Sequence, residues 1–172
     1  FSKLKSDFLD VYLFANCSLC LTTNTGPDNI SLIFNRPIAY IILAITGIMY
    51  NRENIFWLTR NYFSKELNRN LSLREIIELG LCDKNKTYEY EAKSVVPTEP
   101  NSIDIKNYVL DVLDILQKGY LSKDKETNQK KLFNSLKKAS KEASIFGKGN
   151  KEFVIENYKA IFCPSFLEKN PS

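Results

Sequence analysis

The chain has 172 residues, of which 44% are hydrophobic and 12% aromatic, enough for one folded domain with a sizeable core. Its 24 basic and 20 acidic residues leave a net charge of +4, which is too small and too dispersed to indicate nucleic-acid binding. The chain contains no histidine, so the commonest general base and the commonest neutral metal ligand are both excluded.

The first predicted elements are an apolar helix and a short strand. Apolar residues at helical spacing predict a helix at 8–13, with Ser6 and Asp7 placed to cap its start. The apolar run at 19–22 is typical of a strand that is buried on both faces of a parallel sheet.

A polar turn at 23–28 leads into a second predicted helix. Gly26 is free to adopt a positive φ, Pro27 suits a first helical turn, and Asp28 can act as a cap. The helix must end before Pro37, because a residue that precedes proline disfavours the α conformation. It is expected to bury three apolar side chains, Ile30, Ile33 and Phe34.

The turn lies where α/β proteins bind anions, since ligands meet helix N-termini at the carboxyl ends of parallel strands. The alternative is a purely structural turn, and the Asp28 carboxylate would compete with a phosphate. Neither a Walker pattern nor a GxGxxG motif is present. The candidate contacts to a diphosphate are Asn24, Thr25, Gly26, Pro27, Asp28 and Asn29.

Two further strands are expected beyond this turn, at 38–43 and 54–60. The loop 44–54 between them is expected at the carboxyl edge of the sheet, where Arg52 can assist in anion binding. Arg60 is a second auxiliary candidate, although a solvated surface role is the alternative for both arginines. The tryptophan in the second strand is expected in the core.

The middle of the chain carries a clear helix signature and a strand pattern. Ser72 and Glu75 form a capping box, and Gly80 is a natural helix stop. Glu75 and Glu78 share one helical face, but capping and exposure are the expected roles of these carboxylates, rather than catalysis. Alternation at 87–96 predicts a strand.

Helical patterns dominate the last third. They predict a helix from Ser102 to Gly119, a charged flexible connection at 121–129, a helix at 127–145 and a last helical pattern at 153–161. Several lysines of the helix predicted at 127–145 are expected to form a solvated face or, alternatively, to contact an anionic membrane surface. They are Lys130, Lys131, Lys137, Lys138 and Lys141.

Four cysteines remain, Cys17, Cys20, Cys82 and Cys163. The first two have CxxC spacing, but a redox pair should open a helix and this pair closes one. No second CxxC completes a zinc site, so buried free thiols are expected.

Four stretches resemble the C-terminal part of bacterial glycosyltransferases of surface-polysaccharide synthesis. They read TNTGPDNISLIFNRPIAY, NIFWLTRNYF, LSLREIIELGL and CPSFLEKN, and the block from Leu21 to Tyr40 is the most specific. These proteins have the GT-B architecture, in which two Rossmann-type domains face each other across a cleft. The resemblance implies that the turn faces the diphosphate of a nucleotide sugar. Where many such donor sites carry a glutamate after the glycine, this chain has Asp28 and Asn29.

The resemblance implies an α/β, Rossmann-like donor-binding domain over 1–172, with a parallel sheet flanked by helices. Its α/β core would span 1–120 and a helical extension 121–172. Because the first methionine is Met49, an N-terminal domain that holds the acceptor and the general base is expected to precede it. The alternatives are a non-catalytic nucleotide or sugar module and a degenerate transferase domain.

The implied partners are a nucleotide-sugar donor and a sugar or lipid-linked glycan acceptor. No metal, no further cofactor and no nucleic acid are expected. The implied location is the cytoplasm, with peripheral contact to the inner membrane. The most apolar run, 38–50, is too short to span a bilayer.

Overall fold

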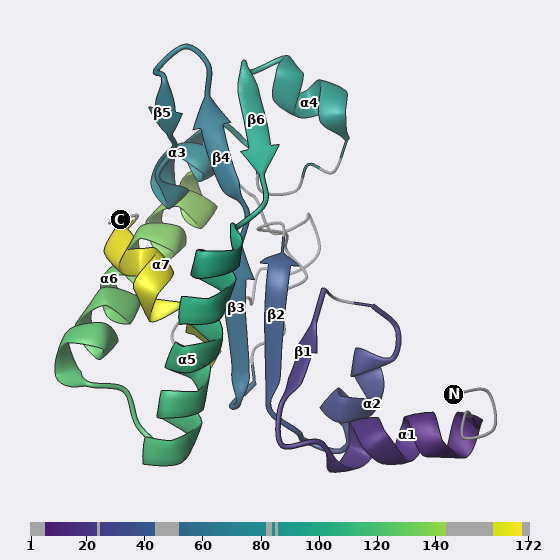
Figure 1. Ribbon diagram of the computed structural model, residues 1–172. Coiled ribbons are helices and arrows are strands. Elements are labelled where there is room, and N and C mark those ends of the chain that lie inside the picture. Colours follow the sequence, from purple (N-terminus) through teal and green to yellow (C-terminus); the bar gives the residue numbers. More distant parts are fainter. Residues whose placement is uncertain are drawn as a thin grey trace.

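A computed structural model describes residues 6–23, 25–43, 52–81, 84, 86–143 and 160–169. It contains a parallel sheet and, beyond one end of it, a small antiparallel sheet (Figure 1). The parallel sheet has the strand order β1-β2-β3-β7, and the antiparallel sheet has the order β5-β4-β6. The expectation of an α/β fold with a parallel sheet flanked by helices is therefore confirmed.

The strands of the parallel sheet are β1 (Cys20–Thr22), β2 (Ile38–Leu43), β3 (Ile55–Thr59) and β7 (Ile161–Phe162). The row Thr22, Tyr40, Trp57 and Phe162 is in register across it. Trp57 is 1% exposed and meets the Phe162 ring edge-on at 5.4 Å, so its expected place in the core is confirmed.

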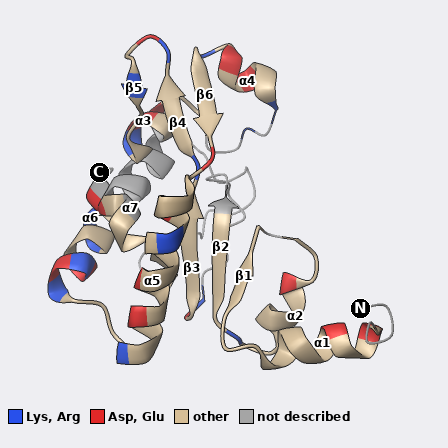
Figure 2. Ribbon diagram, viewed as in Figure 1, with Lys and Arg blue, Asp and Glu red and all other residues tan. Residues whose placement is uncertain are grey.

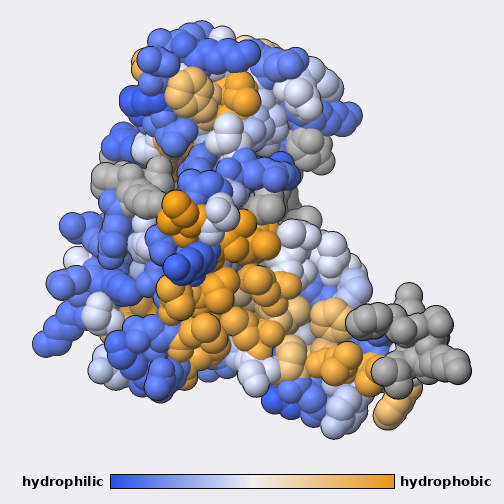
Figure 3. Space-filling model, viewed as in Figure 1, coloured by the Kyte–Doolittle hydropathy of each residue, from blue (hydrophilic) through white to orange (hydrophobic). Residues whose placement is uncertain are grey.

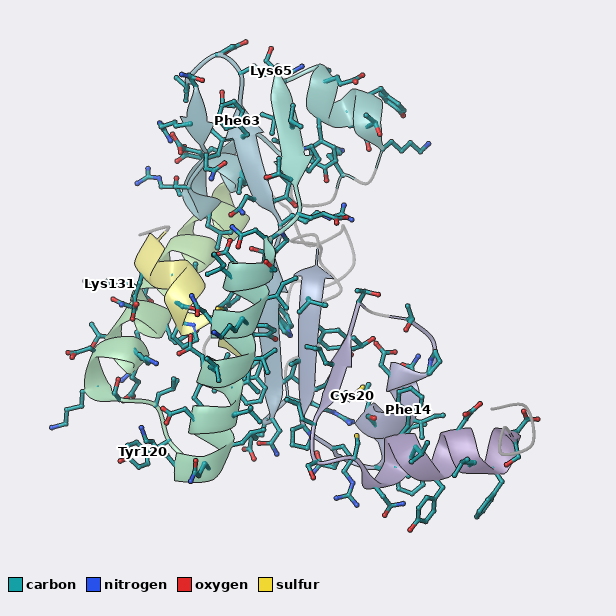
Figure 4. All side chains as sticks on the ribbon, in the orientation of Figure 1. Phe14, Cys20, Phe63, Lys65, Tyr120 and Lys131 are labelled. Atoms are coloured by element: carbon teal, nitrogen blue, oxygen red, sulfur yellow. The ribbon has the colours of Figure 1, made fainter. Side chains whose placement is uncertain are left out.

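Helices α1 (Asp7–Asn16) and α2 (Asp28–Ile33) pack beside β1. Figure 4 shows Cys20 of β1 and Phe14 of α1 close together near α2. The expected apolar inner face of α2 is wrong at two positions, because Ile33 is 77% exposed and Phe34 is 52% exposed. The helix buries Asp28 and Ser31 instead.

Helix α5 (Ser102–Lys118) covers β2 and β3 on the other face of the sheet. Its N-cap is Asn101, one residue before the expected start, whose side chain accepts bonds from the N–H groups of Ile103 and Asp104 at 2.9 Å. The helix ends at Gly119 with φ +73°, as expected.

The small sheet continues directly from β3. Its strands are β4 (Asn61–Ser64), β5 (Arg69–Asn70) and β6 (Val95–Thr98), and Pro97 is tolerated because β6 is an edge strand. The strand expected at 87–96 is wrong over its first half, which forms α4 (Thr87–Glu91). The Glu89 carboxylate accepts a bond from the Lys86 N–H, which favours a helix start there.

Helix α3 (Leu73–Glu78) has the expected capping box. The Ser72 N–H donates to the Glu75 carboxylate at 2.8 Å, and the Glu75 N–H donates to the Ser72 hydroxyl at 3.3 Å. Gly80 follows with φ +68°, so the expected stop is also confirmed.

The last third differs from the expectation at two places. Helix α6 (Lys123–Ala143) begins inside the segment 121–129, so the flexible connection predicted there is wrong. Residues 161–162 form β7, which pairs with β3, whereas a helical extension was expected. Helix α7 (Pro164–Lys169) then packs against α5 and α6. The helical pattern at 153–159 lies outside the described residues.

Gln129 of α6 joins β7 to the rest of the domain. Its side-chain amide donates to the Phe162 carbonyl at 2.6 Å and accepts from the Phe162 N–H at 3.1 Å. Gln129 is 5% exposed and Phe162 is fully buried. The side chain thus pairs with this strand as a neighbouring strand would.

Candidate functional site

The predicted turn lies at the carboxyl end of β1, as expected. Thr25, Gly26, Pro27 and Asn29 are all exposed, so a ligand can reach them. The Thr25 carbonyl accepts a bond from the Asp28 N–H at 3.0 Å, and the Asn29 side chain donates to the Gly26 carbonyl at 3.1 Å. Asn24 lies outside the described residues.

Asp28 has an environment that the sequence did not predict. It is the first residue of α2, it is only 2% exposed, and its carboxylate accepts a bond from the Thr22 hydroxyl at 3.4 Å. Burial raises the pKa of this carboxyl, while bonds from Thr22 and from the Asn29 N–H act in the opposite direction. The N–H groups of Asp28 and Asn29 already donate to the carbonyls of Thr25 and Gly26, at 3.0 and 3.2 Å, so they are not free for a phosphate.

Gly26 does not have the positive φ that was expected. Among the glycines of the described chain, positive φ occurs at Gly80 and Gly119. A Cβ added at Gly26 would have no heavy atom within 4 Å. The fold of the described turn thus places no demand for glycine at this position.

Arg52 lies at the opposite end of the sheet from the turn, and not at the carboxyl edge. It stands just before β3, where the strands begin, and its guanidinium donates to the Leu32 carbonyl at 3.3 Å, near the C-terminal end of α2. Arg52 and the turn residues are therefore not brought together. The rest of the predicted loop, 44–51, lies outside the described residues.

Arg60 does lie at the carboxyl edge, directly after β3. Its Nε is buried and has no hydrogen-bond partner within the described part of the chain. The same holds for the hydroxyl of Thr59, a residue that is 1% exposed and was not predicted as a site residue. A polar Thr-Arg pair directly after an apolar run was the sequence signal for it.

The turn and the Thr59-Arg60 pair occupy the same edge of the parallel sheet. Thr22 of β1 and Trp57 of β3 are in register through β2, which puts β1 and β3 about 10 Å apart. A ligand of extended shape can therefore meet both groups only if it crosses the end of β2. No catalytic base is assigned to this edge.

The other ionisable groups have structural roles. The Arg69 guanidinium and the Ser72 N–H hold the pKa of Glu75 at about 2, and Glu78 pairs with Arg74 at 2.7 Å. The thiols of Cys17, Cys20 and Cys163 are free, and burial raises the pKa of Cys20. Cys82 lies outside the described residues.

The described residues include no group of three or more carboxylate or thiol side chains that could hold a metal ion. Within the same residues, no helix combines the length and the apolar character needed to cross a bilayer.

The fold and this edge define an α/β protein with polar groups at the carboxyl ends of parallel strands. The comparisons with known proteins found no matching family model, no matching curated protein and no matching solved structure.

Proposed function

We propose that this chain binds the diphosphate of a nucleotide sugar at the carboxyl edge of its parallel sheet, as the donor domain of a GT-B glycosyltransferase. The observation that carries the proposal is the pair at the end of β3, where the Thr59 hydroxyl and Arg60 Nε are buried without partners among the described residues. Buried polar groups are normally hydrogen-bonded, so such a pair favours a polar ligand.

A diphosphate fits the chemistry of these groups. An arginine guanidinium forms charge-assisted bonds to phosphate oxygens, and a threonine hydroxyl can donate to a phosphate oxygen. On this proposal the exposed Thr25 hydroxyl and the Gly26 N–H contact the sugar-nucleotide from β1. The resemblance noted in the sequence supplies the reaction class, in which this domain stabilises the nucleotide diphosphate as it leaves.

A non-catalytic nucleotide- or sugar-binding module is the second candidate. The buried Asp28 carboxylate favours it, because a negative charge at the start of α2 weakens a diphosphate held there. Transfer of sugar by the full-length protein, lost on changing Arg60, distinguishes the enzyme from the module.

The test is calorimetric titration of the chain with UDP-, GDP-, TDP- and CMP-linked sugars. We expect one nucleotide class to bind, and Arg60→Gln to weaken it about tenfold to a hundredfold, the range for a lost charge-assisted bond. Arg74→Gln is the matched control, since Arg74 is exposed on α3 and pairs with Glu78. Equal binding by wild type and Arg60→Gln, or no binding of any nucleotide by folded protein, would refute the proposal.

A further inference from the structure

One face of the parallel sheet is left uncovered at β1. Leu21, Ala39 and Phe56 are in register and lie in one row across three strands. Ala39 is fully buried and Phe56 is 2% exposed beneath α5, whereas Leu21 is 47% exposed. Parallel sheets are normally covered on both faces, but no helix covers this face of the sheet at Leu21.

The side of α5 that faces β1 continues this apolar surface. Leu113 is 47% exposed, and Val109 and Leu116 on the same side are only half-buried. Figure 3 shows apolar surface beside α5 that extends toward β1. We call this surface the β1 strip and define it by Leu19, Leu21, Ile41, Val109, Leu113 and Leu116.

Helix α1 is an apolar helix whose side chains are largely exposed. Its N-terminal half extends away from the sheet (Figure 1). Phe8 is 76% exposed and Tyr12 is 52% exposed, with their rings stacked at 6.2 Å, and Val11 and Leu13 are exposed as well. A helix with apolar residues on most sides is normally buried in a larger assembly.

The charges of the two surfaces are complementary. Helix α1 carries only acidic charge, from the exposed Asp7 and Asp10. The six residues that define the β1 strip carry no charge, and the exposed Lys106 of α5 lies three positions before Val109, on a neighbouring part of the helix surface. Figure 2 shows acidic and no basic colour on α1. No ion pair joins Asp7, Asp10 or Lys106 to another described residue.

We propose that two copies of this chain form a dimer in which α1 of each copy covers the β1 strip of the other. Because the exchange is reciprocal, a single two-fold axis covers both β1 strips and buries both α1 helices. Phe8 and Tyr12 pack on the strip, and Asp10 lies near Lys106 of the second copy. The ten residues of α1 span about 15 Å, enough to cover the roughly 10 Å from Val109 to Leu116 along α5.

This proposal does not depend on the nucleotide site, which lies at the carboxyl ends of the strands. The test is sedimentation equilibrium of the whole chain at about 1 to 100 µM, a range that brackets dimers of ordinary affinity. We expect a dimer whose dissociation constant rises at least about tenfold in Tyr12→Ser, since buried tyrosines are frequent hot spots. Tyr88→Ser is the control, because Tyr88 is 62% exposed on α4, away from both surfaces.

A charge exchange makes the test specific. Asp10→Lys and Lys106→Asp should each weaken the dimer, and the two changes together should restore it, because the pair is rebuilt with its signs reversed. All four residues changed are exposed, so circular dichroism should show folded variants. A monomer throughout the concentration range, or a dimer that Tyr12→Ser and both charge changes leave intact, would overturn the proposal.

Discussion

The two hydrogen bonds between the Gln129 side chain and the Phe162 backbone predict how much stability a substitution at Gln129 removes. Gln129→Leu removes a donor at 2.6 Å and an acceptor at 3.1 Å, and both backbone groups belong to a fully buried residue. Each buried group that loses its partner costs about 1–3 kcal/mol, so we expect a loss of about 2–6 kcal/mol for the two groups. For a domain of this length, at about 2–4 °C for each kcal/mol, that lowers Tm by roughly 4–24 °C.

The measurement is chemical and thermal unfolding followed by circular dichroism. Asn134→Leu is the matched control, since it places the same side chain at an exposed position of the same helix and should change stability by less than about 0.5 kcal/mol. Gln129→Glu refines the test, because a carboxylate keeps the acceptor and loses the donor. That variant should be less stable at neutral pH than at acid pH, where a protonated carboxyl donates again. If Gln129→Leu and Asn134→Leu have equal stabilities, the strand-like role of Gln129 is wrong.

Two carboxylates predict opposite pH effects. The folded-state pKa of Glu75 is about 2, below its ordinary value of 4.5, so its stabilising contribution is present above pH 4.5 and is lost as pH falls toward 2. Since Arg69 is half-exposed, we expect only about 1 kcal/mol, and acid titration of Glu75→Gln should lack this part of the transition. Asp28 has a raised pKa, so it destabilises the fold as pH rises above 3.8. Asp28→Asn should therefore stabilise the protein at pH 7 in urea unfolding, and on the proposed function it should bind the nucleotide several-fold more tightly by calorimetry. Weaker nucleotide binding by that variant would show that the carboxylate supports the site.

The sequence predicts the elements whose signals are local. The strands at β2 and β3 follow from short apolar runs, and the starts and stops at Ser72, Gly80 and Gly119 follow from capping chemistry within a few residues. These signals depend on the nearest neighbours in the chain. They are therefore readable without knowledge of the fold.

The wrong predictions concern elements that distant partners decide. Tyr90 packs against Tyr62 and its hydroxyl donates to the Lys84 carbonyl, which suits a helical turn where the alternation of the segment favoured a strand. β7 has two residues and is held by β3 and by Gln129, which lies 33 positions earlier in the chain. No periodicity is measurable over two residues.

The candidate site was predictable only where its signals are local. The turn after β1 has polar, proline and glycine residues in a row, and its location at the carboxyl edge follows from the order of elements. For Thr59 the sequence offers only its place at the end of an apolar run, because the importance of this residue depends on whether its buried hydroxyl finds a partner. Arg52 was misplaced because it comes just before β3, and β3 begins at the end of the sheet opposite to the turn, since β3 is parallel to β2.

The reversed burial of α2 links the candidate site to the proposed interface. The Ser31 hydroxyl donates to the Phe14 carbonyl at 2.9 Å, and the Arg36 Nε donates to the Ala15 carbonyl at 2.6 Å. These carbonyls belong to the last turn of α1, which has no intrahelical donors for them. Ser31 of α2 and Arg36 after it therefore cap the C-terminal end of α1, and Asp28 of the same helix accepts a bond from Thr22 beside the turn after β1. The apolar residues Ile33 and Phe34 are left exposed at the end of α2. The polar contacts hold the last turn of α1, whereas Phe8 and Tyr12 nearer its start are exposed, and it is these residues that the proposed dimer buries.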